Sequence, residues 1–284
     1  MLKRIMLVLL IALIALPVFA GGETEAEGEP SAAALENTPS DPRLYEPGKL
    51  TVATGEPVYP PWMMDDDPAG GKGFENGMIY ALAKELGFDA EDVVWVRQTF
   101  DQGIAPGAKP YDFNIQQFSV TEARREFVDF SIVYYKPEKA VVALPDSGLS
   151  AARSFADLRK VQWGATIGTT DLDYIENLIG ADKVKVFNDQ VGTFQALLGK
   201  QIDATVISLP TALFATAVQI PDATIAAILP HDPNDLGHGL VFEKDNPLVE
   251  WINEGLEAII ADGVIKDLTA QYLVGDESIP TISK

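Results

Sequence analysis

The stretch FSVTEARREFVDFS, residues 118–131, contains the side chains whose types and spacing best suit anion binding. Ser119 and Thr121 precede Arg124 there. A guanidinium group is a planar fork of donors that matches a carboxylate, and hydroxyl or backbone N–H groups can donate to the same anion. The cluster is thus a candidate anion site, in which residue type alone does not distinguish Arg124 from the adjacent Arg125. Two other interpretations remain open: an arginine near two glutamates is often a solvated surface residue, and Thr121 suits a helix N-cap.

Two further loops have residues suited to ligand binding. The loop 55–62 follows the first predicted strand and contains Glu56, Tyr59 and Trp62. The sequence Gly168-Thr169-Thr170 follows another predicted strand and precedes a predicted helix. In open α/β sheets, ligands bind beyond the carboxyl ends of strands, where helix N-termini present free N–H donors. All three stretches fit such positions, and they come from what look like different halves of the chain.

The charge of the chain limits its partners. It has 42 acidic and 21 basic residues, a formal charge of −21, and no cysteine. Nucleic acids and anionic membrane surfaces are poor partners for such a molecule, so any bound anion must be held locally. The absence of cysteine excludes disulfides and thiol chemistry.

The first twenty residues, MLKRIMLVLLIALIALPVFA, predict a cleaved secretory signal peptide. Lys3 and Arg4 form the basic start, residues 5–16 the apolar core, and residues 18–20 a small-residue cleavage site. The apolar core is shorter than the ~20 residues that span a bilayer, so a retained anchor helix is the less favoured alternative. Cleavage removes two positive charges, and we expect a soluble, exported protein of charge −23.

Residues 21–48 are rich in Glu, Ala, Pro, Gly and Ser and predict a disordered leader. Beyond them, short apolar runs alternate with helical patterns, which predicts an α/β fold of mostly parallel sheets with helices on both faces. The predicted strands are 50–53, 93–96, 113–115, 140–144, 161–165, 184–187, 204–207, 224–229 and 239–242. The predicted helices are 78–86, 172–179, 190–198, 210–217, 247–261 and 264–272.

The stretch SVTEARREFVDFSIVYY resembles the signature of family 3 of the periplasmic solute-binding proteins, which are the receptors of ABC importers for polar amino acids. The agreement continues, in the family's order, over about residues 49–275. No single motif is specific, but together and in register they indicate the family. The other agreeing segments are YPPW (59–62), GGKGFENGMIYALAKELGF (70–88), GTT (168–170), QIDATVISLP (201–210) and GLVFEKDNPLVEWINEGLEAIIADGVIKDLTAQYL (239–273).

The resemblance implies a two-lobe type II periplasmic binding fold, in which each lobe is a mostly parallel sheet flanked by helices and two crossing hinge strands join the lobes. By analogy, lobe one comprises residues 49–139 and 240–275, lobe two comprises residues 140–239, and residues 276–284 form a tail. The implied function is that of a monomeric periplasmic receptor that closes on a small carboxylate-bearing solute and delivers it to the membrane subunits of an ABC permease. The same analogy implies no cofactor, no metal and no nucleic acid.

The resemblance also implies roles for single residues. Arg124 stands where the family has the arginine that binds the solute's carboxylate, while Arg125 keeps a surface role. Tyr59, Trp62 and Phe100 stand at the positions of aromatic residues that flank the solute's side chain, where stacking contributes ~0.5–2 kcal/mol. Core packing remains an equal alternative for Trp62.

Four more positions belong to the implied site. Thr170, with the N–H groups after Gly168, would supply donors from the second lobe, although plain helix capping explains it equally well. Glu56 stands where relatives often have an acid that meets a basic group, or it is simply an exposed loop glutamate. Gln117 and the preceding Gln116 replace small residues and suggest a polar, reshaped pocket.

The segment DATVISLP, residues 203–210, departs from the family pattern. Relatives that bind α-amino acids usually have a second aspartate, which accepts the ammonium group, where this chain has Ser208. A serine cannot neutralise a buried cation. Either another acid (Glu56, Asp171 or Asp173) binds the ammonium group, or the solute is not a plain α-amino acid.

An enzyme on the same scaffold is the alternative function. Dehydratases that act on prephenate or arogenate resemble this family and need a general acid in the cleft. Glu56 is the only candidate for that role in the sequence. No nucleophile stands beside a base, and His231 and His238 lack thiol or histidine partners for a metal, so we expect a non-catalytic protein.

Overall fold

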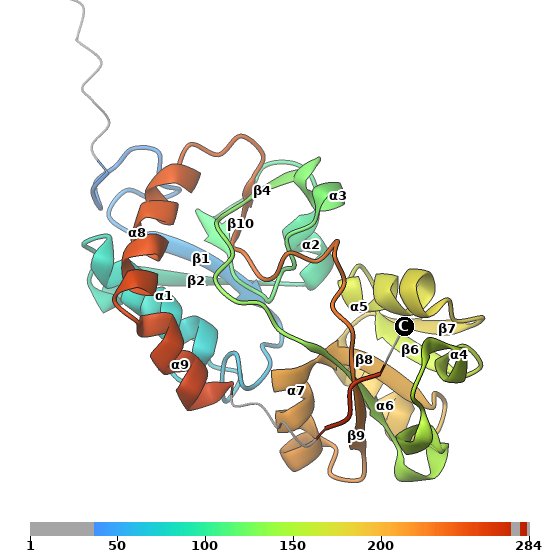
Figure 1. The fold of residues 1–284 in the computed structure, drawn as a ribbon. Helices are drawn as coiled ribbons and strands as arrows, with labels where there is room; N and C mark the ends of the chain where they lie inside the picture. Colours follow the sequence, from blue (N-terminus) through green and yellow to red (C-terminus); the bar gives the residue numbers. More distant parts are fainter. Residues whose placement is uncertain (1–36, 274–278, 283–284) are drawn as a thin grey trace, which may run out of the picture. The chain divides into compact units, whose positions relative to one another are not determined.

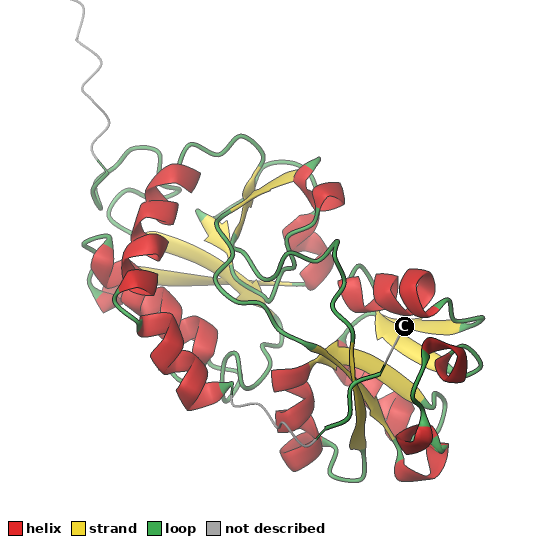
Figure 2. Cartoon of the chain, in the orientation of Figure 1, coloured by secondary structure: helices red, strands yellow, loops and turns green. Residues whose placement is uncertain are grey.

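The computed structural model of the protein describes residues 37–273 and 279–282. The predicted signal peptide, most of the predicted leader and most of the predicted tail lie outside the described residues. The described residues form two five-stranded sheets with helices packed against them (Figures 1 and 2). No helix among them has the length and the apolar composition needed to cross a membrane.

The first sheet has the strand order β2-β1-β3-β10-β4 and the second has the order β7-β6-β8-β5-β9. The strands of the first sheet are β1 (Leu50–Gly55), β2 (Val93–Gln98), β3 (Phe113–Asn114), β4 (Val128–Phe130) and β10 (Val241–Glu243). Those of the second sheet are β5 (Lys139–Ala143), β6 (Trp163–Thr166), β7 (Val184–Phe187), β8 (Ala204–Ser208) and β9 (Thr224–Leu229).

Both sheets are mostly parallel, as the sequence predicts, and each described sheet has one strand that runs the other way. In the first sheet β10 runs antiparallel to β3 and β4, and in the second sheet β5 runs antiparallel to β8 and β9. The remaining pairs are parallel. Strand β5 follows β4 of the first sheet, and strand β10 follows β9 of the second sheet. These two strands, each reached by a crossing between the sheets, are the antiparallel ones. The prediction of an α/β fold with two helix-flanked sheets is confirmed.

The helices pack their apolar faces on these sheets, and the longest of them cover the first sheet (Figure 1). Met78, Ile79 and Leu82 of α1 share one core with Trp251 and Leu256 of α8. Helices α5 and α7 continue as π-helical turns over residues 174–179 and 215–219. The helices are α1 (Phe74–Glu85), α2 (Phe100–Ile104), α3 (Glu122–Arg125), α4 (Phe155–Leu158), α5 (Thr170–Asp173), α6 (Gln190–Leu198), α7 (Leu209–Phe214), α8 (Val249–Ala261) and α9 (Val264–Tyr272).

Residues 37–48, at the end of the predicted disordered leader, form turns packed on the first sheet. The side chain of Leu44 is 4% exposed and belongs to the core of that sheet. Asp41 is buried and pairs with Arg43 at 2.6 Å. The backbone N–H of Tyr45 donates to the Asp112 carboxylate at 2.6 Å. The composition of residues 37–48 is that of a leader, but the burial of Leu44 and these polar contacts hold the stretch against the first sheet.

The end of the described chain belongs to the second sheet. Pro280 accepts a backbone hydrogen bond from Ile228 of β9 at 2.9 Å, and Ile282 donates one to Ile228 at 2.9 Å. The side chain of Ile282 is 2% exposed and lies in the core of the second sheet. Because α9 packs with α1 and α8 on the first sheet, the chain passes to the second sheet again at its end.

Two segments, residues 131–138 and 230–240, join the sheets and lie side by side. The backbone of His238 accepts from Tyr134 at 2.9 Å and donates to Tyr135 at 2.7 Å. This antiparallel bridge holds the two connections together.

Candidate functional site

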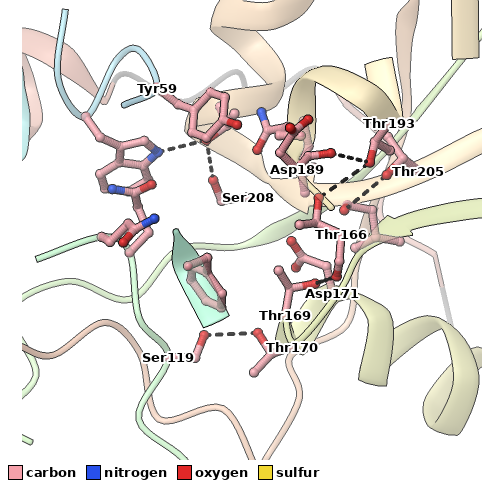
Figure 3. Close-up of a pocket in the computed structure, with 18 of the residues that line it drawn as sticks. Tyr59, Ser119, Thr166, Thr169, Thr170, Asp171, Asp189, Thr193, Thr205 and Ser208 are labelled. Carbon is pink, nitrogen blue, oxygen red and sulfur yellow. Dashed lines mark hydrogen bonds between the residues drawn. The ribbon is translucent and has the colours of Figure 1, made fainter. Parts of the chain in front are cut away.

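A cavity of about 190 Å³ lies between loops that follow strands of both sheets (Figure 3). Nine of the ten residues predicted for the site line it. These are Glu56, Tyr59, Trp62, Phe100, Gln117, Ser119, Arg124, Thr170 and Ser208. The exception is Thr121, whose side chain caps helix α3 by accepting from the backbone N–H of Arg124 at 3.2 Å. For Thr121 the capping interpretation is the one that the structure supports.

Arg124 reaches across the cavity wall from one sheet to the other. Its Nη1 donates to the carbonyl of Ser119 at 2.7 Å, and its Nη2 donates to the carbonyl of Gly168 at 2.8 Å. Its guanidinium carbon lies 5.5 Å from the centre of the Phe100 ring. Burial lowers the pKa of Arg124 from its ordinary value, although nearby aspartates oppose the shift. The group remains a cation because arginine does not lose its proton in proteins.

Arg125 has a different environment. Its side chain is 42% exposed and lies 3.6 Å from Glu122 on the surface. The two adjacent arginines of the sequence are therefore distinguished by the fold: one lines the cavity and the other does not.

Ser119 and Thr170 meet in a buried polar cluster beside Arg124. Their hydroxyl oxygens are 3.0 Å apart, and both donate to Oδ2 of Asp235, at 2.8 and 3.1 Å. Thr169, not Thr170, caps α5, since its hydroxyl accepts from the backbone N–H of Leu172 at 3.2 Å. The hydroxyl of Thr170 is consequently available to join the cluster (Figure 3).

Lys139 completes this polar cluster. Its Nζ lies 3.0 Å from the Thr170 hydroxyl, 2.6 Å from Asp171 and 3.3 Å from Asp235. Burial by itself would lower the pKa of Lys139, but Asp171 and Asp235 raise it, so the side chain is an ammonium ion. The pKa of Asp235 falls below its ordinary value, against the effect of burial, because Lys139 and Ser119 stabilise the carboxylate.

The sequence analysis did not place Lys139, Asp235 or His238 at the site. Lys139 immediately precedes a predicted strand and Asp235 lies in a long connection, so no local motif marks either residue. His238 is buried at the cavity, and burial lowers its pKa to about 3, which leaves it neutral. No described residue makes a hydrogen bond to its Nδ1.

Trp62 both packs in the core and lines the cavity. Its side chain is 1% exposed and meets the ring of Phe74 edge-on at 5.7 Å. Its Nε1 donates to the hydroxyl of Thr211 in α7 at 2.8 Å, which links the two sheets. The loop is held against α1 through Gly73, which has a φ of +130°. Only glycine fits there, because a Cβ atom at this position would lie 2.4 Å from the carbonyl oxygen of Trp62.

Breaking the link between Trp62 and Thr211 tests its part in the solute binding that the sequence predicts. We expect Trp62→Phe to weaken solute affinity by roughly two- to tenfold, because a neutral hydrogen bond contributes about 0.5–1.5 kcal/mol. Titration calorimetry measures the effect, with Trp251→Phe in the first core as the matched control. In a double-mutant cycle with Thr211→Val the two effects should be less than additive, and full additivity would contradict the link.

A buried glutamate holds the backbone of the cavity loop at Gln117. The φ of Gln117 is +53°, in the left-handed region. Glu75 of α1 accepts from the backbone N–H of Gln117 at 2.9 Å, from its side-chain amide, and from the Tyr134 hydroxyl at 2.5 Å. Burial raises the pKa of Glu75 to about 7 despite these donors. The helix predicted over residues 78–86 begins after Glu75, whereas α1 begins at Phe74, and Glu75 stands three and four residues before the apolar Met78 and Ile79, a spacing that could have found it.

Two further acids, Glu56 and Asp189, line the cavity. Glu56 is exposed, and the exposed Asp189 caps α6 by accepting from the backbone N–H of Gly192 at 2.7 Å. Tyr59 has its pKa raised to about 12 by burial and by the charge of Asp189. Ser208 shares a 2.8 Å hydrogen bond with Thr211. The cationic side chains of the cavity, Arg124 and Lys139, thus lie against the Phe100 ring and the Asp171 carboxylate.

Comparison with known proteins identifies the family of the chain. Residues 50–275 match the profile of the bacterial extracellular solute-binding proteins, family 3. The probable histidine-binding protein of Campylobacter jejuni is 26% identical over 230 residues, which cover 78% of this chain and 85% of that protein. The L-cystine-binding protein TcyJ of Escherichia coli K12 is 26% identical over 239 residues, which cover 82% and 86%.

Solved structures show the same fold. An ancestral arginine-binding protein bound to arginine matches with a TM-score of 0.67 and 28% identity, over 80% of this chain and 99% of that chain. The ancestral amino acid-binding protein AncCDT-1, described as a precursor of cyclohexadienyl dehydratase, matches with a TM-score of 0.67 and 26% identity, over 80% and 95%. The chain therefore belongs to family 3 of the bacterial extracellular solute-binding proteins.

Proposed function

We propose that this protein is the periplasmic receptor of an ABC importer and binds a small carboxylate-bearing solute in the cavity between its two sheets. Arg124 binds the carboxylate, the backbone N–H groups of Ser119 and Thr170 add donors, and Tyr59, Trp62 and Phe100 enclose the rest of the solute. The predicted signal peptide would direct the chain to the periplasm, and the membrane subunits of the permease would receive the solute. The protein would act as a monomer and without a cofactor.

The observation that carries this proposal is the position of the Arg124 guanidinium. It lies at the cavity and contacts a carbonyl from each sheet. These two contacts use two of the five N–H donors of the group, so others can bind a carboxylate. A solute bound there would touch groups from both sheets, which favours a closed arrangement of the two and gives hinge-type closure a physical cause.

The relatives support the proposal. The curated relatives in Campylobacter jejuni and Escherichia coli are named as histidine- and cystine-binding proteins, and the ancestral structure has arginine bound. A micromolar affinity requires only about 8 kcal/mol of binding free energy, which a charge-assisted pair and a few stacked rings can provide.

A thermal-shift screen tests the proposed function. The probes are amino acids, 2-oxo and 2-hydroxy acids, opines and dicarboxylates, with polyamines as cationic probes that lack a carboxylate. We expect at least one carboxylate-bearing probe to raise the melting temperature, because saturation at 100 times the dissociation constant adds about 2.7 kcal/mol to the unfolding free energy. Mass spectrometry of the co-purifying solute complements the screen. Stabilisation by polyamines alone would contradict the proposal.

The dehydratase alternative has less support. The relatives named above are binding proteins, and Glu56, its only candidate acid, is exposed. Incubation with prephenate, followed by the absorbance of phenylpyruvate, would reveal that activity.

A further inference from the structure

The charged groups beside Arg124 narrow the class of solute, and this inference rests on the proposed role of Arg124. In an α-amino acid the ammonium group is attached to the carbon next to the carboxylate. Wherever Arg124 holds the carboxylate, the ammonium group must therefore lie in the immediate surroundings of that site. It is stabilised there only if a nearby carboxylate is free to accept it.

Three aspartates act on the charge of Arg124, namely Asp171, Asp173 and Asp235. Of these, only Asp171 lines the cavity. The other acids that line it, Glu56 and Asp189, are not among the groups that act on the guanidinium. Within the described part of the chain, Asp171 is thus the acid that both lines the cavity and acts on the charge of Arg124.

Lys139 already pairs with two of these three aspartates, Asp171 and Asp235. Its ammonium group lies 2.6 Å from Oδ1 of Asp171 and itself lines the cavity. It also lies 3.3 Å from Oδ2 of Asp235, which accepts from Ser119 and Thr170 as well. The second oxygen of Asp235 accepts from the backbone N–H of Gly237 at 3.0 Å. A solute ammonium group at Asp171 would share that carboxylate with the Lys139 ammonium and be repelled by it.

The strand register places Lys139 directly opposite Ser208. The two residues are paired across the antiparallel strands β5 and β8, so their Cβ atoms are about 4.5–5.5 Å apart. The hydroxyl of Ser208 is engaged with Thr211 at 2.8 Å. This cross-strand pair contributes one positive charge and one neutral hydroxyl to the cavity, and no acid.

We propose that the protein selects carboxylate solutes that have no ammonium group on the carbon next to the carboxylate, because Lys139 supplies the ammonium group that Asp171 and Asp235 bind. The solute class is that of 2-oxo acids, 2-hydroxy acids and acids unsubstituted at that carbon. Lys139 and Ser208 together determine the specificity against α-amino acids.

Matched pairs of probes test the inference on the wild-type protein. The probes of each set share a side chain and differ only at the carbon next to the carboxylate. The sets are L-glutamate with 2-oxoglutarate and 2-hydroxyglutarate, L-phenylalanine with phenylpyruvate and phenyllactate, and L-arginine with 5-guanidino-2-oxopentanoate. Titration calorimetry is expected to show the α-amino acid binding about tenfold more weakly, or not at all, because like charges then meet in a partly buried site.

Substitution of the cross-strand pair should reverse this preference. Ser208→Asp adds a carboxylate at the pocket wall, and we expect it to shift the affinity ratio about tenfold towards the α-amino acid. Ser208→Asn is the matched control, because asparagine has the shape of aspartate without its charge. It should leave the affinity ratio as it is in the wild type. Lys139→Met frees Asp171 and should shift the ratio in the same direction. The wild-type comparison remains decisive even where the Lys139 variant does not fold.

The possible outcomes separate this inference from the proposed function. An α-amino acid that binds the wild type as tightly as its 2-oxo and 2-hydroxy counterparts, in a manner that depends on Arg124, would overturn the inference and leave the proposed function intact. Equal ratios in the Ser208→Asp and Ser208→Asn proteins would also overturn it. Binding of no carboxylate probe, or binding that is independent of Arg124, would contradict the proposed function and with it the inference.

Discussion

Replacing Arg124 by Ala is expected to abolish the rise in melting temperature that the solute causes in the wild type. The substitution removes the charged fork at the cavity and its contacts with Ser119 and Gly168. A hydrogen bond to a charged group contributes about 1.5–3 kcal/mol, so two of them correspond to an affinity loss of about 100-fold or more. Arg124→Lys keeps the charge without the planar fork, and we expect an intermediate affinity.

Arg125→Ala is the matched control for this experiment. It removes the same type of side chain one position along the same helix, where the guanidinium lies on the surface near Glu122. The Arg125 variant should keep the full solute-induced shift, measured by differential scanning fluorimetry and confirmed by calorimetry. Retention of the shift in the Arg124→Ala protein, or its loss in both, would refute the assigned role of Arg124.

We expect the free energy of unfolding to change with pH because of Glu75. The pKa of this buried carboxyl is about 7 in the folded protein, against an ordinary value of 4.5. Between these two pH values the unfolded chain releases the proton while the folded protein retains it. The free energy of unfolding therefore falls as the pH rises, by on the order of 3 kcal/mol in total, and no further above about pH 7.

Glu75→Gln cannot ionise and should remove this contribution. In urea denaturation at pH 5 and pH 8, the difference in unfolding free energy between variant and wild type should change by on the order of 3 kcal/mol in favour of the variant at pH 8. The comparison of two proteins is needed because Asp112 and His238 also have shifted pKa values, and their contributions cancel in the difference.

Glu85→Gln provides the control, because Glu85 is an exposed residue of the same helix. The difference in unfolding free energy between the Glu85→Gln protein and the wild type should be the same at pH 5 and pH 8. A pH-independent difference for Glu75→Gln would show that Glu75 is ionised in the folded protein throughout this range, and the assignment of the raised pKa would then be wrong.

The sequence alone determined the features that depend on neighbours along the chain. Strand and helix patterns predict most of the elements and the α/β class, because periodic apolar residues have to face a core. The hydroxyls beside Arg124 and Arg125 likewise mark a candidate anion site, and the resemblance to the family selects Arg124. The fold then places Arg124 at a cavity, while it assigns Thr121 to helix capping.

Only the tertiary structure decided what depends on residues far apart in the sequence. The direction of β5 and β10 depends on where the chain crosses between sheets, and Leu44 fixes residues that look like a leader by packing in a distant core. Lys139 meets Asp171 and Asp235 across 32 residues or more. The physical reason is that a buried charge requires a partner at contact distance, and no local pattern in the sequence specifies which residue will be brought there.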